Sequence, residues 1–398
     1  MMQSDNPSSL EHAPASNQPA FLALLMRELL RNISNGFDVE NHDEERERFG
    51  PKKPRSLKNR LLRAGVSTIS RGKLAVIPTE EIENQAAKLF RLYDVIQKIS
   101  FLHNLLADAY SKNLLVSLLS FRILGWRKIK LPTNNSSYWK NKALADSIAK
   151  NQVSCESKTT NLKLSHFDLN QIGWPITLNY NANGILKTFL LKQYEYNQRD
   201  PAITAAIGDA VIDAGGCWGD TALYFSKMVG PSGHVHTFEF LPSNLNILNS
   251  NLKLNPQLAS RISVVPKALF NISGKKLVFQ ENGPGTKLSE DLVETGANTA
   301  NTTSIDDYVQ ENNITRIGFI KMDIEGAELS ALQGAINTIK RDRPRLAIAL
   351  YHDLNDFVTI PQFLSSLNLG YSFYLDHFTI HDEETILFAE PDTAQKAP

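Results

Sequence analysis

Apolar and polar positions follow two different patterns along this chain, and the change falls near residue 200. Beyond that point, short apolar runs alternate with stretches of helical spacing, which predicts strands connected by helices. The predicted strands span residues 210–213, 234–240, 262–269, 316–322, 345–351, 371–376 and 385–389, and the predicted helices lie near residues 219–228, 243–253, 304–312, 326–340 and 359–368. Five strand–helix steps followed by two closing strands predict an α/β fold with an open, doubly wound sheet.

The first 200 residues lack this alternation. Residues 1–19 are polar and predict a disordered tail, and residues 20–160 predict a mainly helical region that is the candidate for substrate selection. Its clearest apolar stripe consists of Ile82, Ala86, Leu89, Leu92 and Ile96. Residues 161–200 predict a β-rich approach segment, with strand-like pieces at 162–169, 175–180 and 185–194 and turns at Gly173 and Asn183-Gly184. A catalytic domain at 201–390 and a tail at 391–398 complete the predicted organisation.

Charge and hydropathy argue against two classes of partner. The 42 basic and 42 acidic residues cancel, so no net charge attracts nucleic acid or an anionic membrane. The stretch 44–73 mixes both signs but holds a single aromatic residue, Phe49, where stacking on successive bases needs several. The most apolar segment, residues 100–124, contains His103, Asp108, Lys112 and Arg122, whereas a membrane span needs about 20 largely uncharged residues. We therefore expect neither nucleic-acid binding nor a membrane span.

Cysteine usage and the first residues bear on the compartment. Only Cys155 and Cys217 are present, which gives no disulfide framework. The first twenty residues lack the basic and apolar segments of a signal peptide. These features predict a cytoplasmic protein.

One run, residues 210–222, carries the strongest functional signal. Two β-branched residues end at Asp213, a glycine-rich bend with Gly215, Gly216 and Gly219 follows, and Asp220-Thr221 can open a helix. Such a strand–loop–helix junction brings backbone close to a ligand, because the glycines carry no side chains.

Acidic residues also collect at the carboxyl ends of the later predicted strands. Glu239 ends the second strand, Asp323 and Glu325 follow the fourth, and His352 follows the fifth. Because the ligands of open α/β sheets bind at the carboxyl ends of the strands, we expect these side chains to surround a cofactor crevice.

Two cofactors fit a glycine loop followed by an acid about twenty residues later. A nicotinamide dinucleotide would place its ribose on Glu239, but the loop reads Asp-x-Gly-Gly-x-x-Gly and an acid at the strand tip repels a pyrophosphate. S-adenosylmethionine has no phosphate and carries an ammonium and a sulfonium, which Asp213 would attract. The methyl donor is therefore the favoured cofactor, with Glu239 on its ribose.

Four segments resemble the motif series of the FkbM-type methyltransferases. They are Asp213-Ala-Gly-Gly-Cys-Trp-Gly-Asp-Thr, Phe238-Glu-Phe-Leu-Pro-Ser-Asn244, Thr303-Ser-Ile-Asp-Asp307 and Lys321-Met-Asp-Ile-Glu-Gly-Ala-Glu328, and the resemblance spans roughly residues 193–389. The last segment is the most specific. The resemblance implies S-adenosylmethionine-dependent O-methylation of sugars or natural products, on a Rossmann-like, mostly parallel sheet of the class I methyltransferases with an antiparallel last strand.

The same resemblance implies the residues that contact the cofactor. It assigns contacts to Asp213, Gly215, Gly219 and Glu239. Three further cofactor contacts are carried over by position: Thr221 near the ligand's carboxylate, Ala268 near its adenine, and Tyr194 as a cover or as a packing residue.

Methyl transfer to an alcohol needs a group that accepts the hydroxyl proton during attack. The candidates are Asp323, directly after the fourth strand, His352, whose unperturbed pKa suits neutral pH, and Glu325, which is also placed to cap a helix. His352-Asp353, His377 and His381 raise the question of a divalent metal held together with Asp323, but no tight ligand motif is present, so we expect none.

The sequence thus predicts a methyltransferase that moves a methyl group from S-adenosylmethionine to a hydroxyl of a sugar, a glycan or a glycosylated natural product. One alternative is an NAD(P)-dependent oxidoreductase, which the same glycine loop allows. The other is a non-catalytic binding or scaffold protein with a vestigial methyltransferase fold.

Overall fold

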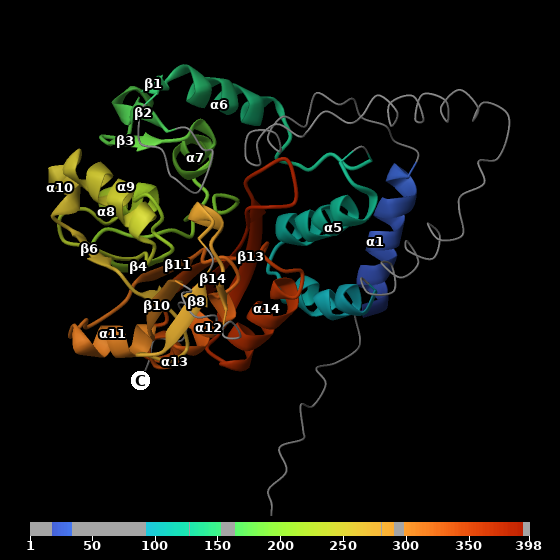
Figure 1. Cartoon of the computed structure of the whole chain (residues 1–398). Coiled ribbons are helices and arrows are strands. Elements are labelled where there is room, and N and C mark those ends of the chain that lie inside the picture. Colours follow the sequence, from blue (N-terminus) through green and yellow to red (C-terminus); the bar gives the residue numbers. More distant parts are fainter. Residues whose placement is uncertain are drawn as a thin grey trace, which may run out of the picture.

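The computed structural model describes residues 18–33, 93–126, 128–152, 164–279, 281–289 and 298–392, whose elements are labelled in Figure 1. Several predictions from the sequence lie outside these residues. They concern most of the N-terminal tail, the charged stretch 44–73, four of the five positions of the apolar stripe between residues 82 and 96, and most of the C-terminal tail.

A seven-stranded sheet forms the centre of the fold. Its strand order is β13-β14-β12-β11-β4-β5-β6. The bounds are β4 Ala210–Ala214, β5 His234–Phe238, β6 Ile262–Val265, β11 Phe319–Met322, β12 Arg345–Ala349, β13 Tyr371–His377 and β14 Thr385–Pro391. The strands from β6 to β12 are parallel, whereas β14 runs antiparallel to both of its neighbours. The predicted Rossmann-like sheet, mostly parallel with an antiparallel last strand, is confirmed.

Both faces of this sheet are buried, which explains its apolar strands. Along β4, Val211 belongs to one core cluster and Ile212 to the other, and Phe319 and Ile320 alternate in the same way along β11. Parallel strands covered on both faces read as continuous apolar runs because neither face meets water. The flanking helices are α8 (Asp220–Val229), α9 (Pro242–Lys253), α10 (Pro256–Ala259), α11 (Ile305–Glu311), α12 (Glu328–Gln333), α13 (Ile336–Asp342) and α14 (Asp356–Ser366).

A second, four-stranded sheet stands beside the first, and the sequence pattern did not predict it. Its order is β7-β10-β8-β9, with bounds Ala268–Leu269 for β7, Lys276–Phe279 for β8, Leu288–Ser289 for β9 and Asn298–Thr303 for β10. The single strand expected at 262–269 is split, and Ala268 lies in the small sheet. Pro266 separates the two pieces, since it has no N–H to donate to a ladder. The strand β10 was missed because its residues are polar.

Two helical segments differ from their predictions. The helix expected at 326–340 is interrupted at Gly334, where an added Cβ would stand 2.3 Å from the carbonyl oxygen of Phe270. The strand expected at 185–194 is wrong, because α7 (Ala182–Ile185) and the π-helical turn η4 (Leu186–Leu190) occupy this segment. Asn181 caps α7 by accepting a hydrogen bond from the Gly184 N–H at 2.7 Å, so the turn expected at Asn183-Gly184 is helical.

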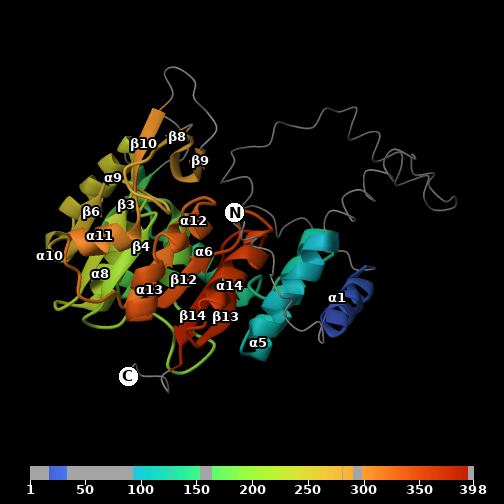
Figure 2. The same cartoon turned by 90° about the horizontal axis from the view of Figure 1, so that it is seen from below.

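The N-terminal region is mainly helical, as predicted, and its residues 109–124 pack against β13 at the edge of the sheet (Figure 2). It contains α1 (Gln18–Asn32), a helix at 93–105, α5 (Ala109–Leu124) and α6 (Ser136–Ser147). A three-stranded sheet of β1 (Lys150–Gln152), β2 (Ser165–Asp168) and β3 (Thr177–Tyr180) follows. Two short 3-10 turns are η3 (Leu169–Ile172) and η5 (Gly283–Gly285). The Ala107 N–H donates to the Phe373 carbonyl at 2.8 Å, which ties this region to β13. Within the described residues, no helix is long and apolar enough to span a bilayer.

Because α5 shares one core cluster with β13, truncating its inner face should destabilise the whole domain. Leu115 is fully buried in that cluster. We expect Leu115→Ala to lower the free energy of unfolding by about 2–5 kcal/mol in urea titrations. Met26 is 53% exposed on α1, so Met26→Ala should change it by about 0.5 kcal/mol or less. A similar small change for Leu115→Ala would contradict a shared core.

Candidate active site

The glycine loop connects β4 to α8 at the carboxyl ends of the parallel strands. Gly215 and Gly219 have positive φ angles of 84° and 86°, which glycine adopts without strain. A Cβ on Gly215 would stand 2.0 Å from the Asp323 carbonyl oxygen, and one on Gly216 would stand 2.0 Å from Thr237 Oγ1. At these two positions the close approach that requires glycine is therefore to the ends of β11 and β5.

Asp213 is fully buried beneath this loop, and its carboxylate is held by neighbouring strands and a helix. Thr221 Oγ1 donates to both of its oxygens at 2.9 and 3.0 Å, and Thr237 Oγ1 donates to Oδ2 at 2.8 Å. The ammonium of Lys321 lies 3.2 Å from Oδ1 in an ion pair that is almost completely buried. The negative charge that was expected to attract a cationic cofactor is thus paired inside the protein.

Lys321 links β11 to the glycine loop. Its Nζ donates to the carbonyl oxygens of Ala214 and Gly215 at 2.9 and 2.7 Å, and it lies 5.3 Å above the ring of Tyr194. Burial by itself would lower the pKa of Lys321, but the nearby aspartates, Asp213 first, raise it above its ordinary value. Lys321 begins the motif segment Lys321–Glu328. The sequence does not show that it holds the glycine loop, because its contact with Ala214 joins residues 107 positions apart.

Glu239 lies one residue beyond β5, and its carboxylate is oriented by the following turn. Oε1 accepts the N–H groups of Phe240 and Leu241 at 2.7 and 2.8 Å, and Oε2 accepts the Asn244 amide at 3.0 Å. Burial raises the pKa of Glu239 to about 7, although these hydrogen bonds oppose the shift. Oε1 thus uses both of its lone pairs, whereas Oε2 keeps one for a further donor.

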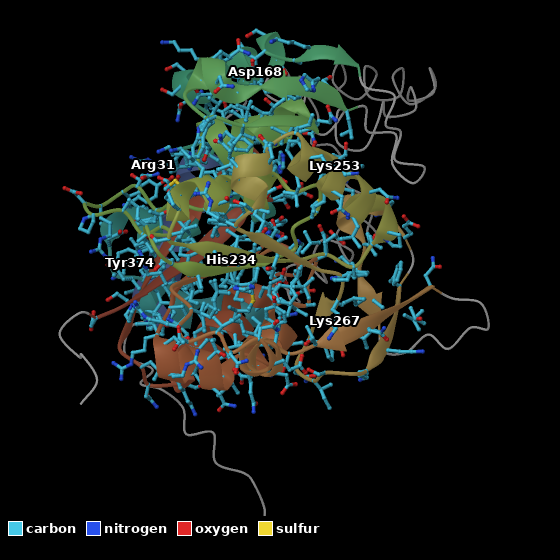
Figure 3. The ribbon with its side chains drawn as sticks, turned by 90° about the vertical axis from the view of Figure 1, so that its left-hand side faces the viewer. Arg31, Asp168, His234, Lys253, Lys267 and Tyr374 are labelled. Atoms are coloured by element: carbon cyan, nitrogen blue, oxygen red, sulfur yellow. The ribbon has the colours of Figure 1, made fainter. Side chains whose placement is uncertain are left out.

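A cavity of about 540 Å³ opens between the glycine loop, the end of β5 and the small sheet. Figure 3 labels His234, where β5 begins, and Lys267, a lining residue just beyond β6; the two mark opposite ends of the parallel strands. Five predicted site residues line this cavity, namely Gly215, Glu239, Ala268, Asp323 and Glu325. Five others do not: Asp213, Gly219, Thr221, Tyr194 and His352. Cys217, Leu241, Asn244, Pro284 and Thr286 also line it and were not predicted.

Asp323 stands at the wall of the cavity between two tyrosines. The Tyr194 hydroxyl donates to its Oδ2 at 3.1 Å and the Tyr351 hydroxyl donates to its Oδ1 at 2.9 Å. Burial raises the pKa of Asp323 above its ordinary value, an effect that the neighbouring His352 opposes. Tyr194, which was expected to cover the cofactor or to pack, is itself buried and holds this carboxylate.

His352 lies behind Asp323 in an acidic environment. Its Nε2 is 3.4 Å from Asp323 Oδ1 and 3.6 Å from Glu325 Oε2, and its Nδ1 is 3.1 Å from Glu328 Oε1. Burial by itself would lower the pKa of His352, but Glu325, Glu328 and Asp323 raise it to about 11. The unperturbed value that suggested a base near neutral pH therefore does not apply to this imidazole.

Glu325 occupies a tight turn before α12. Its φ angle is 59°, and Gly326 follows with φ of 100°. The turn is closed by Glu328, whose Oε1 accepts the Ile324 N–H at 2.7 Å. Glu325 faces the 540 Å³ cavity and also a second cavity of about 830 Å³, whose lining includes His352, Asp353 and Phe270. It is thus the acid shared by the two cavities.

Comparison with known proteins agrees with the resemblance seen in the motifs. Residues 202–373 match the family model described as the methyltransferase FkbM domain. The curated proteins give no match. Among solved structures, the chain is similar to a methyltransferase FkbM from Methylobacillus flagellatus KT, at 20% identity over 76% of this chain and 60% of that one, with a TM-score of 0.47. It is also similar to an O-methyltransferase from Bacillus cereus in complex with SAH, at 12% identity over 65% and 91% of the two chains and a TM-score of 0.32.

The fold is a doubly wound α/β sheet with a cavity at its strand ends, and the family match identifies residues 202–373 as a methyltransferase domain. The chain carries a methyltransferase domain of the FkbM family. The predicted family is confirmed for residues 202–373. The chain spans 60% of the length of the Methylobacillus protein.

Removing the ammonium of Lys321 should leave Asp213 as an unpaired buried charge. Breaking a buried ion pair from one side costs about 3–5 kcal/mol, and we expect Lys321→Met to lower the free energy of unfolding by that amount in urea titrations. The double variant Asp213→Asn/Lys321→Met should be less destabilised than the single one. As a control, Arg31→Gln removes the 77% exposed partner of Glu28 and should cost about 1 kcal/mol or less. An equal loss in the single and double variants would contradict the pairing.

Proposed function

We propose that this protein transfers a methyl group from S-adenosylmethionine to a hydroxyl of a sugar, a glycan or a glycosylated natural product, in the cytoplasm. The observation that carries the proposal is the cavity at the strand ends of the FkbM domain, lined by the glycine loop on one side and by Glu239, Asp323 and Glu325 on the others. When bound, S-adenosylmethionine supplies the electrophilic methyl group of its sulfonium.

The charges that line the cavity fit this cofactor better than a dinucleotide. Among the described lining residues, three are carboxylates and Lys267 is the single cation. Carboxylates repel a pyrophosphate and attract an ammonium or a sulfonium, because charges interact more strongly in a partly desolvated cleft than in water. This argument replaces the one based on Asp213, whose charge Lys321 neutralises.

Different residues around the cavity bind different parts of the cofactor. Glu239 accepts a hydrogen bond from a ribose hydroxyl through the lone pair of Oε2 that its own turn leaves unused. Ala268 and Leu241 line the apolar wall that receives the adenine, and Gly215 lets the methionine portion lie against the loop. Asp213, Gly219 and Thr221 do not line the cavity and act indirectly. They hold the glycine loop and the start of α8 in position.

The acceptor binds on the side of Glu325. The second cavity shares Glu325 with the first and adds Asp353, Ser330 and the ring of Phe270. Such a mixture of hydrogen-bond acceptors and one aromatic face suits a neutral, hydroxyl-rich ring. Asp323 and Glu325 line the cofactor cavity and are the candidates that orient the acceptor hydroxyl and take its proton. His352 remains a predicted base as well, although its environment favours the charged imidazolium.

Cofactor binding should depend on the charge of Glu239. Because its pKa is about 7, the carboxylate that accepts the ribose hydrogen bonds gains its charge between pH 6 and 8. We expect the affinity for S-adenosylhomocysteine to rise by up to about tenfold over this range in calorimetric titrations. Glu239→Gln should bind more weakly by at least about tenfold at pH 8 and lose most of the pH dependence.

NAD⁺ and NADP⁺ serve as controls in the same titrations, since the rival oxidoreductase would bind one of them. Tight dinucleotide binding without binding of S-adenosylhomocysteine would overturn the proposal. An unchanged pH dependence in Glu239→Gln would place the ribose elsewhere.

The wall carboxylates should affect turnover more than cofactor binding. We expect Asp323→Asn to keep the affinity for S-adenosylhomocysteine within about threefold and to reduce methyl transfer by about 10²–10⁴-fold. The measurement is transfer of radiolabelled methyl groups to a panel of sugars and glycosides. Ser330→Ala, in the second cavity, is the matched control and should change the acceptor KM more than kcat. Failure of every acceptor despite cofactor binding would favour the scaffold alternative.

A further inference from the structure

Three side chains behind the cofactor cavity, those of Asp323, Glu328 and His352, form a cluster. The proposed function does not explain why they lie together. One ligand atom from each of Asp323, Glu328 and His352 lies within 4.8 Å of the other two. Glu328 is fully buried and the side chain of His352 is 4% exposed, whereas that of Asp323 is 16% exposed toward the cavity. The cluster is therefore closed on the protein side and reached from the cavity side.

Several buried polar atoms of this cluster have no hydrogen-bond partner among the described residues. One oxygen of Glu328 accepts the Ile324 N–H, but its Oε2 has no partner. Neither ring nitrogen of His352 makes a contact of hydrogen-bond geometry, although carboxylate oxygens lie 3.1–3.6 Å away. Buried polar atoms are almost always satisfied, so orphaned atoms of this kind point to a missing ligand.

The donor set suits a metal ion, which would replace the proton that the surrounding acids favour on His352. Metal–nitrogen and metal–oxygen bonds of about 2.0–2.2 Å place ligand atoms about 3–4.4 Å apart. Asp323 Oδ1 lies 3.4 Å from Nε2 of His352 and Glu328 Oε1 lies 3.1 Å from Nδ1. One ion takes one of these nitrogens, and one ligand atom from each of the three residues lies within 4.8 Å of the other two. An imidazole together with carboxylates suits Mn²⁺ or Zn²⁺ better than Mg²⁺ or Ca²⁺, which prefer oxygen alone. We propose that His352, Glu328 and Asp323 bind one divalent transition-metal ion, contrary to the expectation from the sequence.

The position of the ion gives it a use, and this step rests on the proposed function. Asp323 lines the cofactor cavity, and His352 lines the second cavity that we assign to the acceptor. An ion held between them can take an acceptor hydroxyl as a further ligand and lower its pKa. Glu325, which lines both cavities, is then placed to receive the proton. Binding of the ion itself does not depend on this role.

Binding is tested on the full-length, tag-free protein after treatment with EDTA. We expect calorimetry with MnCl₂ to give one ion per chain, and pulsed electron paramagnetic resonance of the Mn²⁺-loaded protein to show coupling to an imidazole ¹⁴N. Glu328→Gln and His352→Gln should each weaken Mn²⁺ binding by at least about tenfold. Asp353→Asn is the matched control, because it removes a neighbouring charge outside the donor set, and its affinity should stay within about twofold.

The proposal is overturned if neither Mn²⁺ nor Zn²⁺ binds saturably to the unmodified protein, or if Mn²⁺ binds without nitrogen coupling. It is also overturned if both variants, folded by circular dichroism, bind as tightly as the unmodified protein. Should a variant fail to fold, the stoichiometry and the nitrogen coupling of the unmodified protein decide alone. S-adenosylhomocysteine binding, measured in parallel, separates failure of the metal site from failure of the proposed function.

Discussion

The buried ion pair between Asp213 and Lys321 is the interaction on which the cofactor side of this domain depends. It joins the ends of β4 and β11, the central strands of the large sheet, and Thr221 and Thr237 extend the contact to α8 and β5. Lys321 also fixes two carbonyl groups at the start of the glycine loop. A single buried network thus sets the positions of the loop and of the strand ends that surround the cavity.

This network changes the meaning of the most prominent acid in the sequence. A strand-end acid beside a glycine loop suggests a direct partner for a cationic cofactor, but Asp213 already has a cation. The acids that remain available to a ligand are Glu239, Asp323 and Glu325, which line the cavity. The negative charge of the cavity is therefore carried by residues other than Asp213, and the glycines serve the packing of the loop.

Periodic apolar runs predicted the large sheet and most of its helices because burial on both faces leaves a strong pattern. The four-stranded sheet was not predicted because β10 is polar and Pro266 splits an apolar run. The cavity wall formed by Pro284 and Thr286 was therefore not predicted either. Strand-end position identified Glu239, Asp323 and Glu325. It could not show that Tyr194 binds Asp323, or that Glu328 and His352 meet, because these contacts join distant segments.

The central claim is that S-adenosylmethionine binds in the cavity between Glu239 and Asp323. A crystal structure of the protein with S-adenosylhomocysteine tests it most directly. The account predicts that the ribose hydroxyls lie within hydrogen-bond distance of Glu239, that the adenine lies against Ala268, and that the sulfur faces Asp323. A ligand bound elsewhere, or bound here with its ribose away from Glu239, would contradict the account.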